Sequence, residues 1–282
     1  MKKKKKPLKT IDFAISSLPK TRKEQFFDVL SHRFFLLMGM GGLLLLFSLP
    51  FLGVSLYKDV SSMAIEASNA EGAAKQQSLF FMMLIYRLAC LPAFLILSLG
   101  LSGTQKIYKE LLYDEPIFFR SDFLSGIKEN WKQYFLLASF FWLFWFISEL
   151  ASSFFTNIFV EVLFPGINIA LIYPAIFVAF FLMNTYTNSF GKNMTCGYAL
   201  YFKAFPSVIL TFLAVFALTF LKYIPLILVK YTVILLCFLL YVPISLLLAY
   251  ENQMRLFDLY INKEQFPDFY QKGLASFYSK KE

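Results

Sequence analysis

Few side chains in this sequence have the chemistry of a catalytic or metal site. The single histidine, His32, stands next to Arg33, and the three cysteines are scattered without a CxxC spacing. A histidine-based zinc site and a Ser-His-Asp triad therefore lack the residues that they need. The phosphate-binding patterns GxxxxGK(S/T) and GxGxxG are also absent from the sequence. We expect no enzyme activity, no bound metal and no cofactor.

Five polar residues inside apolar segments are the best candidates for a functional site. A charge in hydrocarbon is costly unless it is paired or hydrated. On the topology argued below, the four charged residues approach the outer face of a membrane, where they could form ion pairs or line a polar vestibule, with Asn168 one turn deeper. The alternative is that each long side chain extends separately to the outer headgroups. The five residues are Arg87, Glu149, Glu161, Asn168 and Lys230.

The stretch FFRSDFLSGIKENWKQYF, residues 118–135, interleaves charges with aromatic residues. Its apolar residues recur at spacings of three and four, which predicts an amphipathic helix that begins shortly after Pro116. Such a helix lies flat at the cytoplasmic membrane interface and anchors the next span, or it docks on a partner protein. Its apolar face consists of Phe119, Phe123, Ile127, Trp131 and Tyr134.

The composition is that of a membrane protein. Of the 282 residues, 58% are hydrophobic, 20% are aromatic and only 16% are charged, whereas charged residues make up about a quarter of a soluble domain. The net charge of +9 would suit nucleic acid, but in so apolar a chain it is better explained by a basic rim that faces anionic headgroups. We therefore expect the lipid bilayer as a partner and no nucleic acid.

Six segments are apolar and long enough to cross a bilayer, which takes roughly 20 residues of helix. The sequence thus predicts an all-α, polytopic membrane protein with a six-helix transmembrane domain over 34–250. A basic arm with a lead-in helix (1–33) precedes this domain, and a cytoplasmic tail (251–282) follows it. The predicted spans are about 34–57, 79–102, 133–156, 165–186, 205–221 and 224–249.

Basic residues set the expected orientation. Short cytoplasmic loops retain Lys and Arg, and most of the 27 in this chain fall on the side of the N-terminus, so both termini are expected in the cytoplasm. The first apolar run begins near Phe34 and has no small-residue cleavage site, which indicates a span and not a signal peptide. Residues 58–77, between the first two spans, are expected to be helical with a break at Ser68–Gly72.

Three of the predicted spans share a pattern in which one proline precedes an aliphatic run that ends in polar residues. We infer a unit of one amphipathic lead-in helix and a two-span helical hairpin, used three times, with the first lead-in near 24–33. Repeats of this kind often frame the binding site of a transporter. The alternative is that prolines are simply common in membrane helices. The three stretches are LPAFLILSLGLSGTQ from Leu91, YPAIFVAFFLMNTYTN from Tyr173 and VPISLLLAYENQ from Val242.

The first half of the chain resembles the YesL-type family of bacterial integral membrane proteins. The resemblance rests on LLLLFSLPFLGVS (43–55), on the span from Leu91 to Gln105, and on DFLSGIKENWKQYFLLASF (122–140). It implies a multi-pass protein of the bacterial cytoplasmic membrane that assists a carbohydrate ABC importer, whose permease subunits would be its partners. It transfers no catalytic or ligand-binding residue to this chain.

The chain departs from the family pattern in two places. It inserts the polar residues 58–77 where the family turns quickly, and its basic N-terminal arm is longer. We therefore keep two functions open: an accessory protein that binds other membrane components, and a small-molecule or lipid transporter built from the three two-helix units.

Overall fold

The chain folds into a bundle of helices. The computed structural model describes residues 18–68, 72–154 and 158–279, and no β-strand occurs among them. The all-α class predicted from the sequence is therefore confirmed.

Four helices, three of them very long, make up the first half of the chain. The first begins where the Thr21 hydroxyl accepts a hydrogen bond from the Glu24 N–H, a side-chain cap. The second and third pack along each other, and the fourth packs on the third. The helices are α1 (Arg22–His32), α2 (Phe34–Ala67), α3 (Gly72–Leu112) and α4 (Phe119–Phe154).

The second half of the chain is built from shorter pieces. Two π-helical segments and a longer 3-10 segment interrupt its helices, and such interruptions disturb the regular hydrogen-bond ladder. In chain order the elements are α5 (Ile158–Ile167), the π-helix η2 (Asn168–Ile172), α6 (Tyr173–Thr185), α7 (Phe190–Lys203), α8 (Phe205–Phe216), the 3-10 helix η3 (Ala217–Tyr223), α9 (Ile227–Leu239), α10 (Tyr241–Phe257), the π-helix η4 (Asp258–Asn262), α11 (Lys263–Gln265), the short 3-10 helix η5 (Pro267–Phe269) and α12 (Ala275–Tyr278).

Five helical segments among the described residues are long and apolar enough to cross a membrane. They are Phe34–Ala67, Gly72–Leu112, Phe119–Ala151, Val162–Thr185 and Phe205–Tyr223. A sixth crossing is present if the pair Ile227–Leu239 and Tyr241–Gln265, which bends by 45°, counts as one span. These helices indicate a multi-pass membrane protein.

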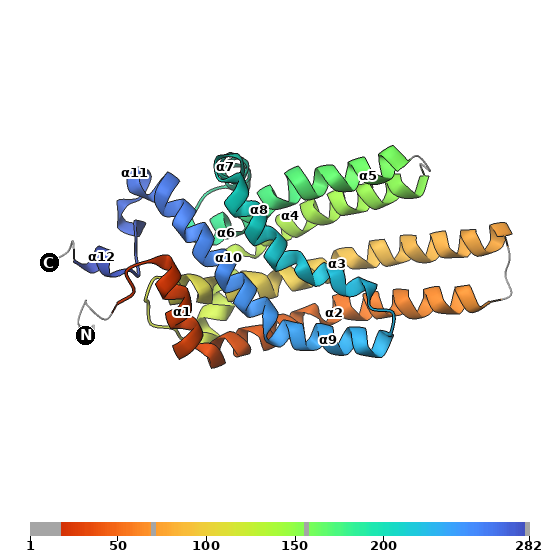
Figure 1. The fold of residues 1–282 in the computed structure, drawn as a ribbon, viewed down its shortest axis with the longest axis horizontal. Coiled ribbons are helices and arrows are strands. Elements are labelled where there is room, and N and C mark those ends of the chain that lie inside the picture. Colours follow the sequence, from red (N-terminus) through yellow and green to blue (C-terminus); the bar gives the residue numbers. More distant parts are fainter. Residues whose placement is uncertain (1–17, 69–71, 155–157, 280–282) are drawn as a thin grey trace, which may run out of the picture.

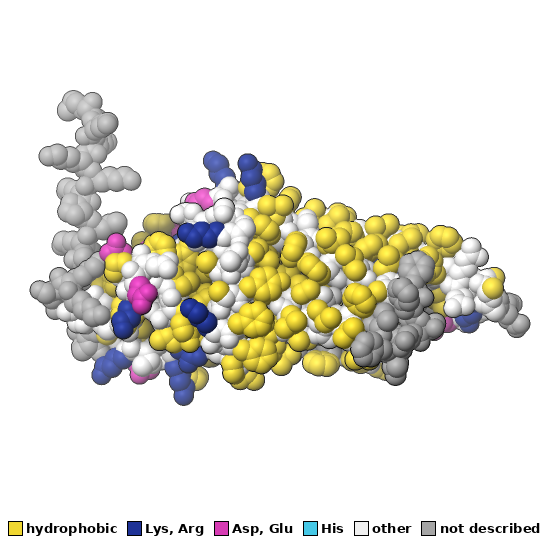
Figure 2. Space-filling view, turned by 90° about the horizontal axis from the view of Figure 1, so that it is seen from above, with side chains coloured by type: hydrophobic (Ala, Val, Ile, Leu, Met, Phe, Trp, Pro, Cys, Tyr) yellow, Lys and Arg dark blue, Asp and Glu magenta, His cyan; other side chains and the backbone are white. Residues whose placement is uncertain are grey.

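The molecule is elongated, and its long helices run along its long axis (Figure 1). Both ends of the described chain lie at one end of the bundle together with α1, α11 and α12, and we call this the basic end. The C-terminal ends of α2 and α4 lie at the other end, the far end. Figure 2 shows a broad apolar band over the middle of one face, with most of its visible Lys and Arg side chains at the basic end.

Two helices, α6 and α10, form the centre of the half of the bundle nearest the basic end. In α6, Pro174–Ala179 and Phe181–Thr185 are buried, and 11 of the 17 residues of α10 are buried, whereas a stripe that includes Leu248 and Arg255 is exposed. Aromatic rings fill the space between them, since Phe181 and Tyr250 meet edge to face with centroids 5.2 Å apart. This packing places the side chains of Glu251 and Gln253 of α10 inside the protein.

The structure differs from the expected boundaries because several helices run further than the predicted spans. α2 continues to Ala67 and α3 begins at Gly72, so the predicted helical extensions on both sides of Ser68–Gly72 are confirmed. Residues 69–71 of the predicted break lie outside the part of the chain that the structure describes. The predicted start of the C-terminal tail, at residue 251, falls inside α10, which continues to Phe257.

The stretch 118–135 does not form a separate helix. Its residues make the first half of α4, a single helix of 36 residues that continues into the third span. The physical reason is that no proline or other strong helix breaker lies between Phe119 and Phe154. By contrast, α1 and α7 each end before the next helix, and Pro206 follows the end of α7.

Candidate functional site

The apolar face predicted for residues 119–135 packs inside the protein instead of lying flat on a membrane. Phe123 is buried between α2 and α3: its ring centroid is 5.7 Å from that of Phe47, and a Cβ added at Gly103 would lie 2.6 Å from its ring. Tyr134 is also buried, and its hydroxyl donates to the Phe180 carbonyl over 3.1 Å. This part of the face is therefore occupied by the chain itself.

The remaining members of that face are less enclosed. Phe119 and Ile127 are half-buried, and Trp131 is exposed over 41% of its surface. Polar contacts fix the helix as well, because the Ser102 hydroxyl donates to the Gly126 carbonyl over 2.9 Å. Only the edge around Trp131 remains open to a bilayer or a partner.

Three of the five polar residues predicted as a cluster lie on α4 or on elements packed against it. The Arg87 guanidinium of α3 is 3.2 Å from a Glu149 carboxylate oxygen of α4, and the Trp142 indole N–H donates to the Arg87 carbonyl over 2.9 Å. The Asn168 amide, at the start of η2, donates to the Phe144 carbonyl over 3.1 Å. The side chain of Glu161 lies outside the part of the chain that the structure describes.

The fifth residue, Lys230 of α9, pairs with a residue that the sequence did not single out. Its ammonium lies 2.5 Å from a carboxylate oxygen of Asp59 in α2, and the Tyr231 hydroxyl donates to the same oxygen over 3.2 Å. Lys58 also contacts Asp59 at 3.2 Å and lies over the Tyr86 ring, with its ammonium 5.4 Å from the centroid. Asp59 was missed because the sequence placed it in the predicted outer loop, whereas α2 extends through it.

We expect Asp59→Asn to lower the free energy of unfolding by about 1–2 kcal/mol, less than a fully buried ion pair would lose, because Lys230 is long enough to snorkel toward headgroups. The measurement is equilibrium unfolding in mixed detergent micelles. Glu66→Gln, an exposed carboxylate on the same helix, is the matched control and should leave stability unchanged. Equal stability of the Asp59 variant and the control would contradict a structural role for the pair.

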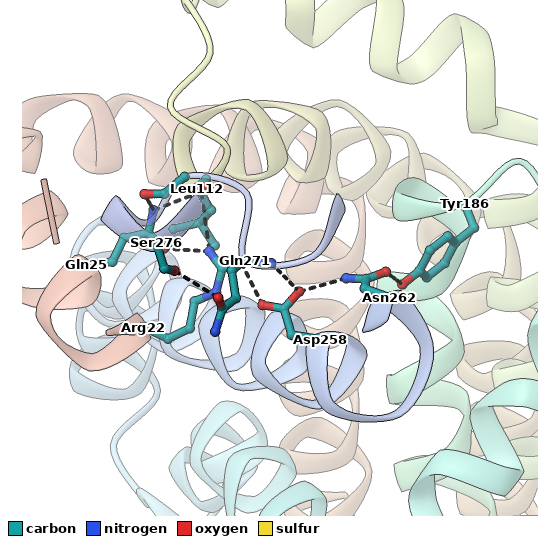
Figure 3. Close-up of polar contacts among 9 residues, drawn as sticks. Arg22, Gln25, Leu112, Tyr186, Asp258, Asn262, Gln271 and Ser276 are labelled. Atoms are coloured by element: carbon teal, nitrogen blue, oxygen red, sulfur yellow. Dashed lines mark hydrogen bonds and ion pairs between the residues drawn. The ribbon is translucent and has the colours of Figure 1, made fainter. Parts of the chain in front are cut away.

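A buried polar network at the basic end ties the first helix to the C-terminal segment. Arg22 of α1 forms an ion pair of 2.9 Å with Asp258 of η4 and donates to the Gln25 amide oxygen over 2.7 Å. The other Asp258 oxygen accepts from the Asn262 amide over 2.9 Å and from the Gln271 N–H over 3.0 Å. We call these five residues the terminal clasp, and Figure 3 shows them converging from α1, η4 and the C-terminal segment.

Two flanking contacts connect the terminal clasp to the transmembrane helices. The Gln25 amide donates to the Leu112 carbonyl at the end of α3 over 2.8 Å, and the Tyr186 hydroxyl at the end of α6 donates to the Asn262 amide oxygen over 2.5 Å. The ends of the chain are thereby fixed to two of the three proline-containing spans.

The polar ends of all three proline-containing spans meet inside the basic end. The Asn184 amide of α6 donates to the Gln105 carbonyl of α3 over 2.7 Å and to the Tyr250 hydroxyl of α10 over 3.0 Å. The side chains of Gln105, Glu251 and Gln253 are buried, and within the described residues none of their terminal polar atoms has a hydrogen-bond partner. The sequence pattern of a proline followed by a polar end marked these three spans, but it did not predict that their polar ends meet.

The sites consist of ion pairs and hydrogen bonds that position helices. Among the described residues, no three or more His, Cys, Asp or Glu side chains are grouped so that they could hold a metal ion. No family model matches the chain, and no curated protein or solved structure that was compared is similar to it.

Proposed function

We propose that this chain is an accessory protein of a bacterial cytoplasmic membrane that binds other membrane components, with the permease subunits of a carbohydrate ABC importer as its partners. The basic end would face the cytoplasm, in line with the retention of Lys and Arg on that side. The proposal follows the resemblance to the YesL-type family, which stays a prediction.

The observation that carries the proposal is the length of α2 and α3. At 1.5 Å per residue, the 34 residues of α2 span about 51 Å, well beyond a hydrocarbon core of about 30 Å. At the far end both helices project past α4, α5 and α9 (Figure 1). We call residues 58–67 and 72–78 the outer arm, to distinguish them from the basic N-terminal arm. It carries exposed apolar side chains such as Val60 and Met63, which suit contact with a protein that stands on the outer face.

The interior of the bundle supports binding over transport. α6 is largely buried, and its residues from Pro174 to Met183 are all apolar. A polar substrate would therefore meet a hydrocarbon-like segment between the polar network at the basic end and the ion pairs nearer the far end. Transport sites, by contrast, are typically polar near the middle of the membrane.

A three-fold use of one structural unit is part of the proposal. α1 precedes α2 and α7 precedes α8, each the start of a predicted span, and the bends between them are alike: Arg33 has φ −123° and ψ 22°, and Ala204 has φ −124° and ψ 32°. The second unit would differ only in that its lead-in is fused with its span in α4. Equal bends at corresponding positions support a repeat.

Site-specific photocrosslinking in native membranes tests the proposal. A photoreactive amino acid at Met63 of the outer arm should give a covalent adduct with an importer subunit, identified by mass spectrometry. The same group at Leu210, an exposed apolar residue of α8, is the control and should react with lipid alone. The absence of an adduct between the photoreactive group at Met63 and any importer subunit would contradict the proposal.

A second candidate function, small-molecule or lipid transport, is favoured by two features. The crossings of the second half are interrupted by η2, by η3 and by the bend before α10, and broken helices line many transport sites. The buried Gln105, Glu251 and Gln253 would be hydrated in an open state. Introducing Gln253→Cys into a chain without its three cysteines tests this: labelling by a maleimide in membranes would favour transport, and complete protection would oppose it.

A further inference from the structure

An apolar groove runs between α8 and α10 on the surface of the transmembrane region. Its volume is about 370 Å³, within the range of about 300–1,000 Å³ that is usual for small-ligand pockets. It lies beside the bend between α9 and α10, and the Tyr241 hydroxyl donates to the Ala214 carbonyl across it. The groove is lined by Ala214, Leu240, Tyr241, Ile244, Ser245 and Leu248.

A polar and basic site follows the groove along the same stripe of α10, toward the basic end. On α10, Asn252 and Arg255 follow Leu248 at spacings of four and three, so they continue the same stripe of the helix. Ser207 faces them from the first turn of α8, and its hydroxyl donates to the Asn252 amide oxygen over 2.8 Å. The Arg255 guanidinium donates to the Ser207 hydroxyl oxygen over 3.0 Å and to the Asn252 amide oxygen over 3.1 Å.

Two cations at this site have neutral neighbours. Arg255 is exposed and held by Ser207 and Asn252, and Lys203, at the end of α7, lies over the Tyr260 ring with its ammonium 5.8 Å from the centroid. Within the described residues, neither cation forms an ion pair with a carboxylate. Their charge is therefore available to an anion from outside the protein.

We propose that this groove binds one anionic phospholipid, with an acyl chain along Leu248 and Ile244 and the phosphate at Arg255, where Lys203 adds positive charge from the end of α7. The apolar lining fits a hydrocarbon chain, and Leu240 and Leu248 are exposed toward the surrounding bilayer. The planar guanidinium suits bidentate contact with a phosphate, and a negative headgroup supplies the counter-charge that both cations lack. The proposal is independent of the proposed accessory function.

The test measures phosphatidylglycerol binding to the purified, delipidated full-length chain by native mass spectrometry. The double variant Lys203→Gln with Arg255→Gln should bind about 25-fold more weakly, because each cation near an anionic headgroup contributes roughly fivefold. Leu248→Trp, which fills the groove without changing charge, should also reduce binding. Phosphatidylcholine should bind the unmodified chain far more weakly than phosphatidylglycerol.

The matched control is the double variant Arg120→Gln with Lys132→Gln. It removes the same two charge types at exposed positions of α4, and Lys132 also lies over an aromatic ring, that of Trp131. This control should bind phosphatidylglycerol as the unmodified chain does. Equal losses in the two double variants, or unchanged binding in Leu248→Trp, would overturn the proposal. If glycerol phosphate bound as strongly as phosphatidylglycerol, the proposal would be overturned too, because no acyl chain would then be needed for binding.

Discussion

Replacing Asp258 with alanine is expected to lower the free energy of unfolding by about 3–5 kcal/mol, the loss typical of a buried ion pair that is deprived of one partner. The Arg22 side chain is only 7% exposed and the Asp258 side chain 10%, so the guanidinium would be left without its counter-charge. The substitution also removes the acceptor of the Asn262 amide and the Gln271 N–H. Unfolding in mixed micelles, followed by circular dichroism, measures the change.

Two further variants show whether the terminal clasp causes this loss. Asp268→Ala removes an exposed carboxylate from the same C-terminal segment and should be neutral. The double variant Arg22→Met with Asp258→Leu should recover much of the stability, since apolar residues can replace a buried ion pair. A neutral Asp258→Ala variant, or a double variant no better than the single one, would contradict this account of the clasp.

Gly41→Leu is the second substitution for which we expect a large effect, a loss of at least about 2 kcal/mol, because overpacking a tight interface costs roughly 1–3 kcal/mol and sometimes more. A Cβ at Gly41 of α2 would lie 2.6 Å from the Phe238 carbonyl oxygen and 2.8 Å from that of Leu239. These backbone atoms lie at the bend between α9 and α10, so they cannot move aside as a flexible side chain would.

The neighbouring glycine provides an unusually close control. A Cβ at Gly42 meets no heavy atom within 4 Å, although both residues lie in the same turn of α2. Gly42→Leu should therefore keep its stability or gain slightly, because leucine favours a helix more than glycine does. Melting temperatures of the two variants in the same detergent give the comparison, and equal values would mean that α2 does not approach the bend this closely.

The sequence predicted the membrane class and most of the helical segments. Hydrophobic runs of the required length report on the solvent around a segment, and this property is local. The end of α2 near Ser68 and the start of α3 at Gly72 were also predictable from local sequence, since helix formers surround a short polar stretch that contains Gly72. The proline pattern also marked the three spans whose polar ends meet at Gln105, Asn184 and Tyr250.

The sequence misjudged features that depend on what a helix packs against. An amphipathic pattern shows that one face avoids water, but bilayer and protein are equally apolar partners for that face. The face around Phe123 and Tyr134 was therefore assigned to the membrane interface or to a partner protein, whereas α3 and α6 of the same chain cover these two residues. α4 is continuous because its sequence contains no proline. The absence of a helix breaker is a weaker signal in a sequence than the presence of one, so the continuity of α4 was not predicted.

Charge partners were decided by the tertiary structure alone. The ammonium of Lys230 lies 2.5 Å from a carboxylate oxygen of Asp59, which is 171 residues away in the sequence. The guanidinium of Arg22 lies 2.9 Å from a carboxylate oxygen of Asp258. Neither pairing could be predicted from the positions of these residues in the sequence. Composition and periodicity by themselves determined that this chain is a helical membrane protein with a basic side. These properties depend on the free energy of transferring each residue from water to the bilayer, which is a local property of the sequence. Which helices became neighbours, and hence which charges pair and where a groove remains, depends on how side chains of distant segments fit together.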